Sequence, residues 1–233
     1  MGSTTSVRTL PGSRLALFGA ILYLLEWAFI IPSGVRVPRS GSTAAQIAAA
    51  YMTQPSSGFA LLFAGLSVVL LGRIAFIAGL RTALRQTNET RALADFAFGA
   101  MTASVVLEVV GEVLRWTASR MATQSADPLT LVALHQSFEG LTFIVGAALG
   151  VSILAASLAM LLSREFPRWL AVLGLVAGAL FIGLAFYAAL TAGFPGVSGI
   201  AWLAWAAWLL TTGVILFRRA GPVFPRYRKE TGP

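Results

Sequence analysis

Six long apolar segments set the strongest limit on what this chain can fold into. A transmembrane helix needs about 20 apolar residues, and each segment is near or above that length. Only 11% of the 233 residues are charged, whereas soluble domains carry about 25% and use them to cover a surface that faces water. The sequence therefore predicts an all-α, polytopic transmembrane helix bundle with about six spans. The segments are 15–32, 58–80, 93–117, 129–163, 168–191 and 198–217.

Turn-forming residues separate these segments. Residues 32–34 end the first, and Asp127-Pro128 opens the fourth with Asp as N-cap and Pro in the first turn. Residues 166–168 divide the fourth segment from the fifth, and 194–196 divide the fifth from the sixth. The fourth segment is longer than a bilayer requires, so we expect it to protrude, tilt or break, or to contain a seventh span.

Two smaller patterns add local detail. Thr43-x-x-Gln46 is a capping-box pattern, and it predicts a short helix over 43–52 that lies on the membrane surface. Gly146-x-x-x-Gly150 and Gly174-x-x-x-Gly178 are small-residue motifs suited to close contact between helices.

Basic residues predict the orientation. With six spans both termini lie on one side, and that side holds twelve basic residues against four on the other. This asymmetry indicates cytoplasmic termini, in a multi-pass protein of the bacterial cytoplasmic membrane whose partner is the lipid bilayer. We expect one transmembrane domain over 1–217 and a basic cytoplasmic tail over 218–233. Topology also explains the net charge of +8, so no nucleic-acid partner is expected. Arg73, inside the second segment, is expected to snorkel toward the cytoplasmic end.

Four glutamates and the only histidine lie inside apolar segments, where each charge costs about 2.5–3.5 kcal/mol. All of them fall in the outer half of the predicted bilayer. In the third segment, Glu108, Glu112 and Arg115 are spaced i, i+4 and i+7. In the fourth, His135, Glu139 and Thr142 repeat that spacing. Each set of three therefore forms a polar stripe on one helical face. We therefore expect one shared site inside the bundle. Its candidate catalytic residues are Glu26, Glu108, Glu112, His135 and Glu139.

A basic residue and several aromatic residues lie at the same depth. Arg115 is the expected counter-ion, either for Glu112 or for Glu139 across the bundle. The aromatic residues fit either an interfacial belt or an apolar pocket wall above a polar floor. The candidate substrate-binding residues are Arg115, Trp27, Trp116, Phe138, Trp202 and Trp205.

Several functions remain open for this cluster. Paired carboxyl groups in a dry pocket suit acid–base chemistry, such as epoxide opening, isomerisation or cyclisation, on a small lipophilic substrate. This leading hypothesis, an enzyme of the isomerase, cyclase or hydrolase type, needs neither a metal nor a cofactor. A second alternative is a metal site, although di-iron bundles use Glu-x-x-His and this chain has His-x-x-x-Glu. Proton- or cation-coupled transport and a non-catalytic partner subunit with a structural ion-pair network are the others.

Part of the chain resembles a known group of proteins. The segment 163–178, with Pro167-Arg168-Trp169-Leu170 at the start of the fifth span, resembles an uncharacterised family of six-helix bacterial membrane proteins that is described as a domain of unknown function. Arg14-Leu15 and the Ala-Gln-Ile-Ala-Ala-Ala stretch at 45–50 are also similar to it. The resemblance implies the fold and the membrane location, and no activity. In size and buried carboxylates the chain is also loosely similar to small membrane-bound terpenoid cyclases, but their motifs are missing, so that likeness is an analogy.

Overall fold

The computed structural model describes residues 12–38, 41–124, 127–191 and 198–220. All regular structure in these residues is helical, and six helical stretches are long and apolar enough to cross a membrane. The predicted all-α bundle with six spans is thus confirmed. The helices are α1 (Gly12–Leu24), α2 (Trp27–Ser33), α3 (Ala44–Met52), α4 (Ser56–Leu84), α5 (Asn88–Thr123), α6 (Pro128–Ser163), α7 (Arg168–Thr191) and α8 (Ser198–Arg219).

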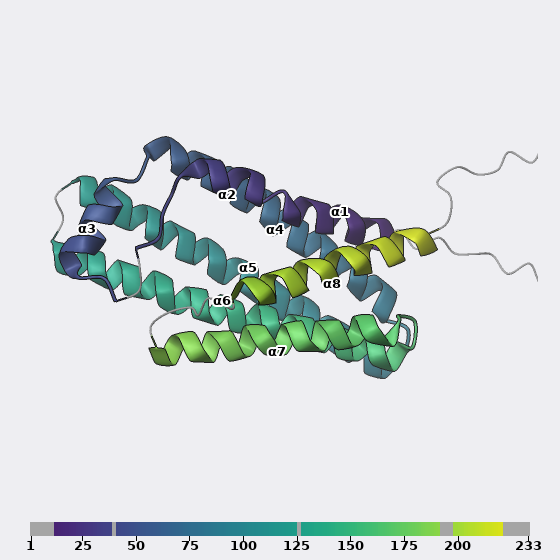
Figure 1. Ribbon diagram of the computed structural model, residues 1–233. Helices are drawn as coiled ribbons and strands as arrows, with labels where there is room; N and C mark the ends of the chain where they lie inside the picture. Colours follow the sequence, from purple (N-terminus) through teal and green to yellow (C-terminus); the bar gives the residue numbers. More distant parts are fainter. Residues whose placement is uncertain (1–11, 39–40, 125–126, 192–197, 221–233) are drawn as a thin grey trace, which may run out of the picture.

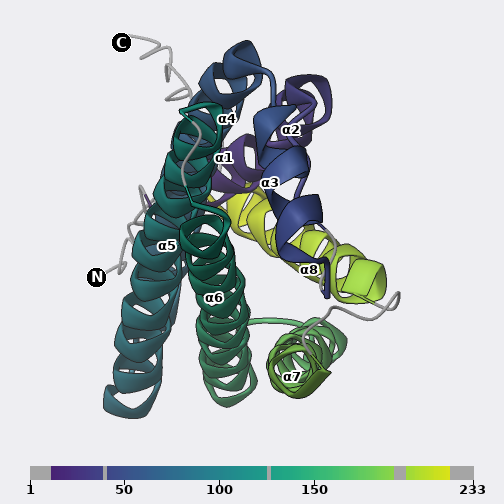
Figure 2. The same ribbon diagram turned by 90° about the vertical axis from the view of Figure 1, so that its left-hand side faces the viewer.

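The six spans form a closed ring of neighbours. α1 packs on α4, and the ring continues through α5, α6 and α7 to α8, which returns to α1. Figure 1 shows that the start of α1 and the end of α8 lie at one end of the bundle, here called the terminal end. The short helix α3 lies at the opposite end, the α3 end, across the ends of α5 and α6 (Figure 2). The cytoplasmic orientation of the terminal end remains a prediction from the charge asymmetry.

The predicted boundaries differ from the observed ones in two places. The fourth segment neither breaks nor contains a seventh span, because α6 is one continuous helix of 36 residues. The first segment does break, at residues 25–26, and is divided into α1 and α2. Residues 194–196 and the tail beyond Ala220 lie outside the described residues. Arg218 and Arg219 still belong to α8.

The predicted caps are present. Thr43 and Gln46 form the capping box that starts α3, and Asp127 accepts a hydrogen bond from the Thr130 amide at the start of α6. The side chains of Ile47 and Tyr51 anchor α3, because both are buried against residues of α5 and α6.

Glycines on one face of α4 let α1 and α2 approach closely. A Cβ atom on Gly72 would lie 2.6 Å from the backbone nitrogen of Tyr23, and one on Gly65 would lie 2.6 Å from Cβ of Phe29. No larger residue fits these positions unless the helices move apart. The glycines recur every seven residues, so they share a face of the helix. They are Gly58, Gly65, Gly72 and Gly79.

Glycines also bring α6 and α7 into close contact. A Cβ atom on Gly150 would lie 2.7 Å from the carbonyl oxygen of Gly178, and one on Gly178 would lie 2.8 Å from that of Gly150. These two residues are the second glycines of the two small-residue motifs, whose close contact is confirmed here.

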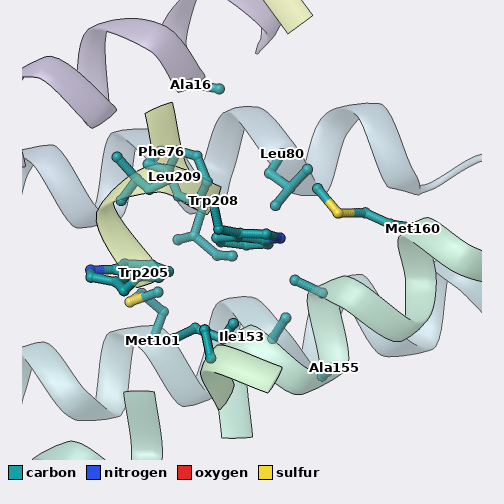
Figure 3. Packing of buried hydrophobic residues seen from close by; sticks show 14 of the residues in the cluster. Ala16, Phe76, Leu80, Met101, Ile153, Ala155, Met160, Trp205, Trp208 and Leu209 are labelled. Carbon is teal, nitrogen blue, oxygen red and sulfur yellow. The ribbon is translucent and has the colours of Figure 1, made fainter. Parts of the chain in front are cut away.

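Aromatic rings fill the middle of the bundle on the terminal side of Arg73. Trp205 and Trp208 of α8 stack with ring centres 5.4 Å apart, and Phe76 of α4 meets both rings edge-on. Figure 3 shows these side chains among residues of α4, α5 and α6, including Leu80 and Met101. We call Phe76, Trp205 and Trp208 the aromatic layer.

Candidate functional site

Arg73 forms a buried ion pair across the bundle. Its Nη1 lies 2.6 Å from Oε2 of Glu108, and its guanidinium lies 5.2 Å from the centre of the Tyr23 ring. Arg73 is only 1% exposed, so the prediction that it snorkels toward the cytoplasmic end is wrong. The glycine face of α4 explains the difference, because it brings Tyr23 of α1 against Arg73 while α5 supplies the counter-ion.

A second ion pair lies one turn further along α5. Nη2 of Arg115 lies 2.5 Å from Oε2 of Glu112, so Glu112 rather than Glu139 is the partner of Arg115. The Arg115 guanidinium also lies 5.3 Å from the centre of the Phe138 ring on α6. Glu108, Glu112 and Arg115 thus share one face of α5, as their spacing predicts, and each carboxylate has an arginine partner.

His135 links α6 to the short helix α3. The Nδ1 atom of His135 lies 3.1 Å from the Tyr51 hydroxyl, and its Nε2 lies 3.6 Å from Oε1 of Glu139. The hydroxyl of Ser119 on α5 donates a hydrogen bond to the carbonyl oxygen of Tyr51. Burial raises the pKa of Tyr51 above its ordinary value of 10.0, so its hydroxyl keeps its proton. This group of residues therefore fastens α3 to the bundle.

A central cavity of about 300 Å³ lies inside the ring of helices. Its walls come from α4, α5, α6, α7 and α8. Arg73, Glu108 and Glu112 give it one charged side, and most of its other residues are apolar. The lining residues beyond these three are Leu107, Gly111, Phe138, Thr142, Val145, Gly146, Leu149, Phe181, Leu184 and Trp202.

A smaller cavity of about 110 Å³ lies on the other side of the same α5 carboxylates. Glu108 and Glu112 line both cavities, and Glu26 and Arg115 complete the polar wall of the smaller one. Glu26 is placed there by the break between α1 and α2, since it immediately precedes α2. Its buried Oε2 has no hydrogen-bond partner among the described residues.

The predicted site residues are therefore only partly brought together. Glu26, Glu108, Glu112 and Arg115 meet at the smaller cavity. His135 and Glu139 are not among the residues that line either cavity in the described part of the chain. Whether any of these residues acts in catalysis remains a prediction.

The predicted aromatic residues also divide into groups. Phe138 and Trp202 line the central cavity, whereas Trp205 belongs to the aromatic layer. Trp27 and Trp116 are 48% and 41% exposed and lie on the outside of the bundle, where an interfacial belt accounts for them.

Three residues of this region were missed as site candidates in the sequence. Arg73 carried a recognisable signal, because an ionisable residue inside a span is functional by default. Tyr23 could have been found from the seven-residue glycine repeat of α4, which marks where α1 packs closely. Tyr51 carried no such signal, because its role depends on how α3 docks.

The geometry does not support a metal site of carboxylates and histidine. Among the described residues, no three His, Asp or Glu side chains are grouped so that they could hold a metal ion. Glu108 and Glu112 are instead paired with arginines, whose positive charge would repel a cation at those oxygens.

Comparisons with known proteins identify a family and no activity. No curated protein and no solved structure matches the chain. The sequence profile described as "Domain of unknown function (DUF4386)" matches residues 16–219, which include all six spans and both cavities. The resemblance to a family of membrane proteins of unknown function is thereby confirmed, and the chain belongs to the DUF4386 family.

Proposed function

We propose that this protein is a membrane-embedded enzyme that performs acid–base chemistry on a small lipophilic molecule in the central cavity. One observation carries the proposal: Glu108 and Glu112 line the central cavity on one side and the smaller, more polar cavity on the other. The carboxylates can thus meet an apolar substrate on one side and exchange protons with water on the other.

The two arginines suit the carboxylates to act as bases. Two carboxylates one turn apart disfavour each other's ionised form, but Arg73 and Arg115 each neutralise one of them. Glu26 has no arginine partner in the described part of the chain and lines the smaller cavity rather than the central one, so it can supply protons to Glu108 and Glu112 but not directly to a substrate in the central cavity. A carboxylate that takes up a proton becomes the acid that returns it, so Glu108 and Glu112 can supply both the base and the acid that a proton-transfer enzyme requires.

Isomerisation is the simplest reaction that such a site supports. One carboxylate removes a proton from the carbon skeleton of the substrate, and a carboxylic acid returns a proton at another carbon as the double bond shifts. Protons and electrons balance without a cofactor. Acid-assisted epoxide opening and cyclisation would use a protonated Glu108 or Glu112 as the donor, since these carboxyl groups line the central cavity.

Two further features favour an enzyme over the alternatives. The aromatic layer lies between the central cavity and the terminal end of the bundle, which argues against a continuous transport path. A purely structural ion-pair network would not need a cavity beside it. The bacterial cytoplasmic membrane is the proposed location, supported by the charge asymmetry of the sequence.

Deuterium incorporation tests this function and does not require the substrate to be identified first. Membranes containing the wild type, Glu108→Gln or Glu112→Gln, prepared from cells grown in ordinary water, would be incubated in D₂O, and their lipid extracts compared by mass spectrometry. Acid–base turnover predicts a product that gains deuterium from the solvent when the wild type is present. With either variant, that product should remain unlabelled. Glu89→Gln is the control, because Glu89 is an exposed carboxylate at the start of α5. Identical extracts from the wild type and both site variants, at equal protein levels, would refute the proposal.

A further inference from the structure

We infer that the central cavity binds an uncharged, elongated molecule with one oxygen acceptor near one end, and that Arg73 donates a hydrogen bond to this oxygen. The inference builds on the proposed function for the location of the site, but it concerns binding and not turnover. Three features of the cavity support it: the charge of its wall, the free donor on Arg73 and the distribution of apolar residues.

The charges around the cavity already balance. Arg73 pairs with Glu108, and Glu112 pairs with Arg115. An anionic or cationic ligand would bring a charge that no unpaired group in the lining of the central cavity compensates, and an unpaired charge in a desolvated site is strongly unfavourable. The cavity wall therefore favours a neutral molecule over a fatty acid or an alkylamine.

Arg73 supplies the reason for an oxygen acceptor. The residue lines the central cavity and is 1% exposed, and its Nε has no hydrogen-bond partner among the described residues. A guanidinium has five N–H donors and no acceptor, and a buried donor left without an acceptor is unfavourable. A carbonyl, hydroxyl or epoxide oxygen on the ligand would accept this hydrogen bond.

The lining of α6 gives the cavity its length. The residues of α6 that line the cavity run from Phe138 to Leu149, a distance of about 16 Å along a helix. Phe138 lies at the charged end, because a Cβ atom on the neighbouring Gly111 of α5 would lie 3.6 Å from its ring. Leu149 lies at the other end, three residues before Ser152, which donates a hydrogen bond to the Ala97 carbonyl far along α5.

The volume limits the size of the ligand. Ligand pockets range from about 300 to 1,000 Å³, so a cavity of about 300 Å³ is at the small end of that range. It suits one hydrocarbon chain or one small terpenoid-sized skeleton, and excludes a two-chain phospholipid as the resident ligand.

A photo-crosslinking competition tests the inference on the full chain in nanodiscs. The probe is a linear methyl ketone of about ten carbons with a diazirine at the far end of its chain. We expect saturable labelling of peptides around Leu149 of α6 and Phe181 of α7. The unlabelled ketone should displace the probe about tenfold or more better than the matching carboxylate or amine, since only the charged competitors leave an unpaired charge in the cavity.

A cavity-filling variant gives an independent check. Leu149→Trp should abolish labelling, whereas Leu158→Trp on the lipid-facing side of α6 should leave it unchanged. A thermal unfolding scan of each variant shows whether it is folded. If Leu149→Trp unfolds the protein, the competitor series still decides, because it needs no substitution.

The outcomes separate this inference from the proposed function. Equal or stronger competition by the carboxylate or the amine overturns the neutral ligand, and labelling spread evenly over all helices overturns the site. Ketone binding without any deuterium-labelled product would sustain the ligand class and refute the enzyme. A deuterium-labelled product together with stronger competition by a charged ligand would sustain the enzyme and refute the neutral ligand.

Discussion

The two halves of this bundle are built from the same six spans, but their interiors differ: one is filled by large side chains and the other contains charged groups and cavities. On the terminal side of Arg73, indole and phenyl rings fill the interior, and the aromatic layer is almost free of exposed surface. The two ion pairs and the smaller cavity lie at Arg73 and beyond it toward the α3 end, and the central cavity extends from that charged level to Leu149. The difference indicates that close packing of large side chains stabilises the terminal half, whereas the interior beside the charged residues contains cavities.

The largest expected effect concerns the buried ion pair at the boundary of the two halves. Arg73→Met would leave the Glu108 carboxylate without its partner and should cost about 3–5 kcal/mol of unfolding free energy, measured by denaturant titration in mixed micelles. The double variant Arg73→Met/Glu108→Leu should recover much of that loss.

Arg85→Met is the matched control, because Arg85 forms an exposed ion pair with Asp95 and such pairs contribute about 0–1 kcal/mol. If Arg73→Met and Arg85→Met lost the same unfolding free energy, the buried Arg73–Glu108 pair would contribute no more to stability than an exposed pair.

A filled interior should also be sensitive to the loss of an aromatic ring. Trp208→Ala would remove a fully buried side chain from the aromatic layer and should destabilise the protein by about 3 kcal/mol through the cavity that it leaves. Trp169→Ala, at a position that is 58% exposed, should change stability little in the same titration. A similar small change for both would contradict the comparison of the halves.

The glycine face of α4 provides a third, smaller test. Gly72→Ala would place a methyl group against the backbone of Tyr23, and overpacking of this kind costs about 1–3 kcal/mol. Gly183→Ala on α7 has open space around it and should be neutral or stabilising by up to about 1 kcal/mol. Thermal unfolding of both variants in one detergent would compare them, and a stable Gly72→Ala protein would show that α1 can yield there.

The smallest expected effect concerns the attachment of α3. Tyr51→Phe removes the contact with Nδ1 of His135 and should cost about 0.5–1.5 kcal/mol, while Tyr187→Phe on the exposed face of α7 should cost nothing measurable. Because burial raises the pKa of Tyr51 in the folded protein, its stabilising effect is complete below its unfolded value of 10.0 and is lost as the pH rises through the folded pKa. Alkaline unfolding at the same pH in wild type and Tyr51→Phe would contradict this role.

The sequence predicts the spans well because apolar length alone decides whether a helix crosses the bilayer. The glycine contact of α6 and α7 was predictable for a similar reason, since small residues on one helical face permit close approach. The pairing of charges was harder to predict. Spacing along α5 places Glu112 and Arg115 on one face, but the choice between Glu112 and Glu139 depends on the rotation of α6 against α5.

Arg73 shows that the depth of a residue along its helix is not enough to predict whether its side chain is buried. Its position near the middle of α4 is compatible with both snorkelling and burial, and the neighbouring helix decides between them. Tyr23 reaches Arg73 because Gly72 has no side chain, which is a contact between two helices rather than a property of either one. The two cavities were not predictable, because they depend on how the large side chains of five helices divide the interior.

The length of α5 determines how the charged groups meet the lipid. We expect Asp95, which is paired with Arg81 and Arg85, to lie at the headgroup layer next to the terminal end, because charged groups avoid the hydrocarbon core. At 1.5 Å per residue, Glu108 lies about 20 Å further along and Arg115 about 30 Å, which is the whole hydrocarbon thickness. We therefore expect residues 116–123 of α5 and the helix α3 to form a small cap that projects beyond the acyl chains. A molecule dissolved in the leaflet at the α3 end would meet water, headgroups and the Glu112–Arg115 pair at the same depth.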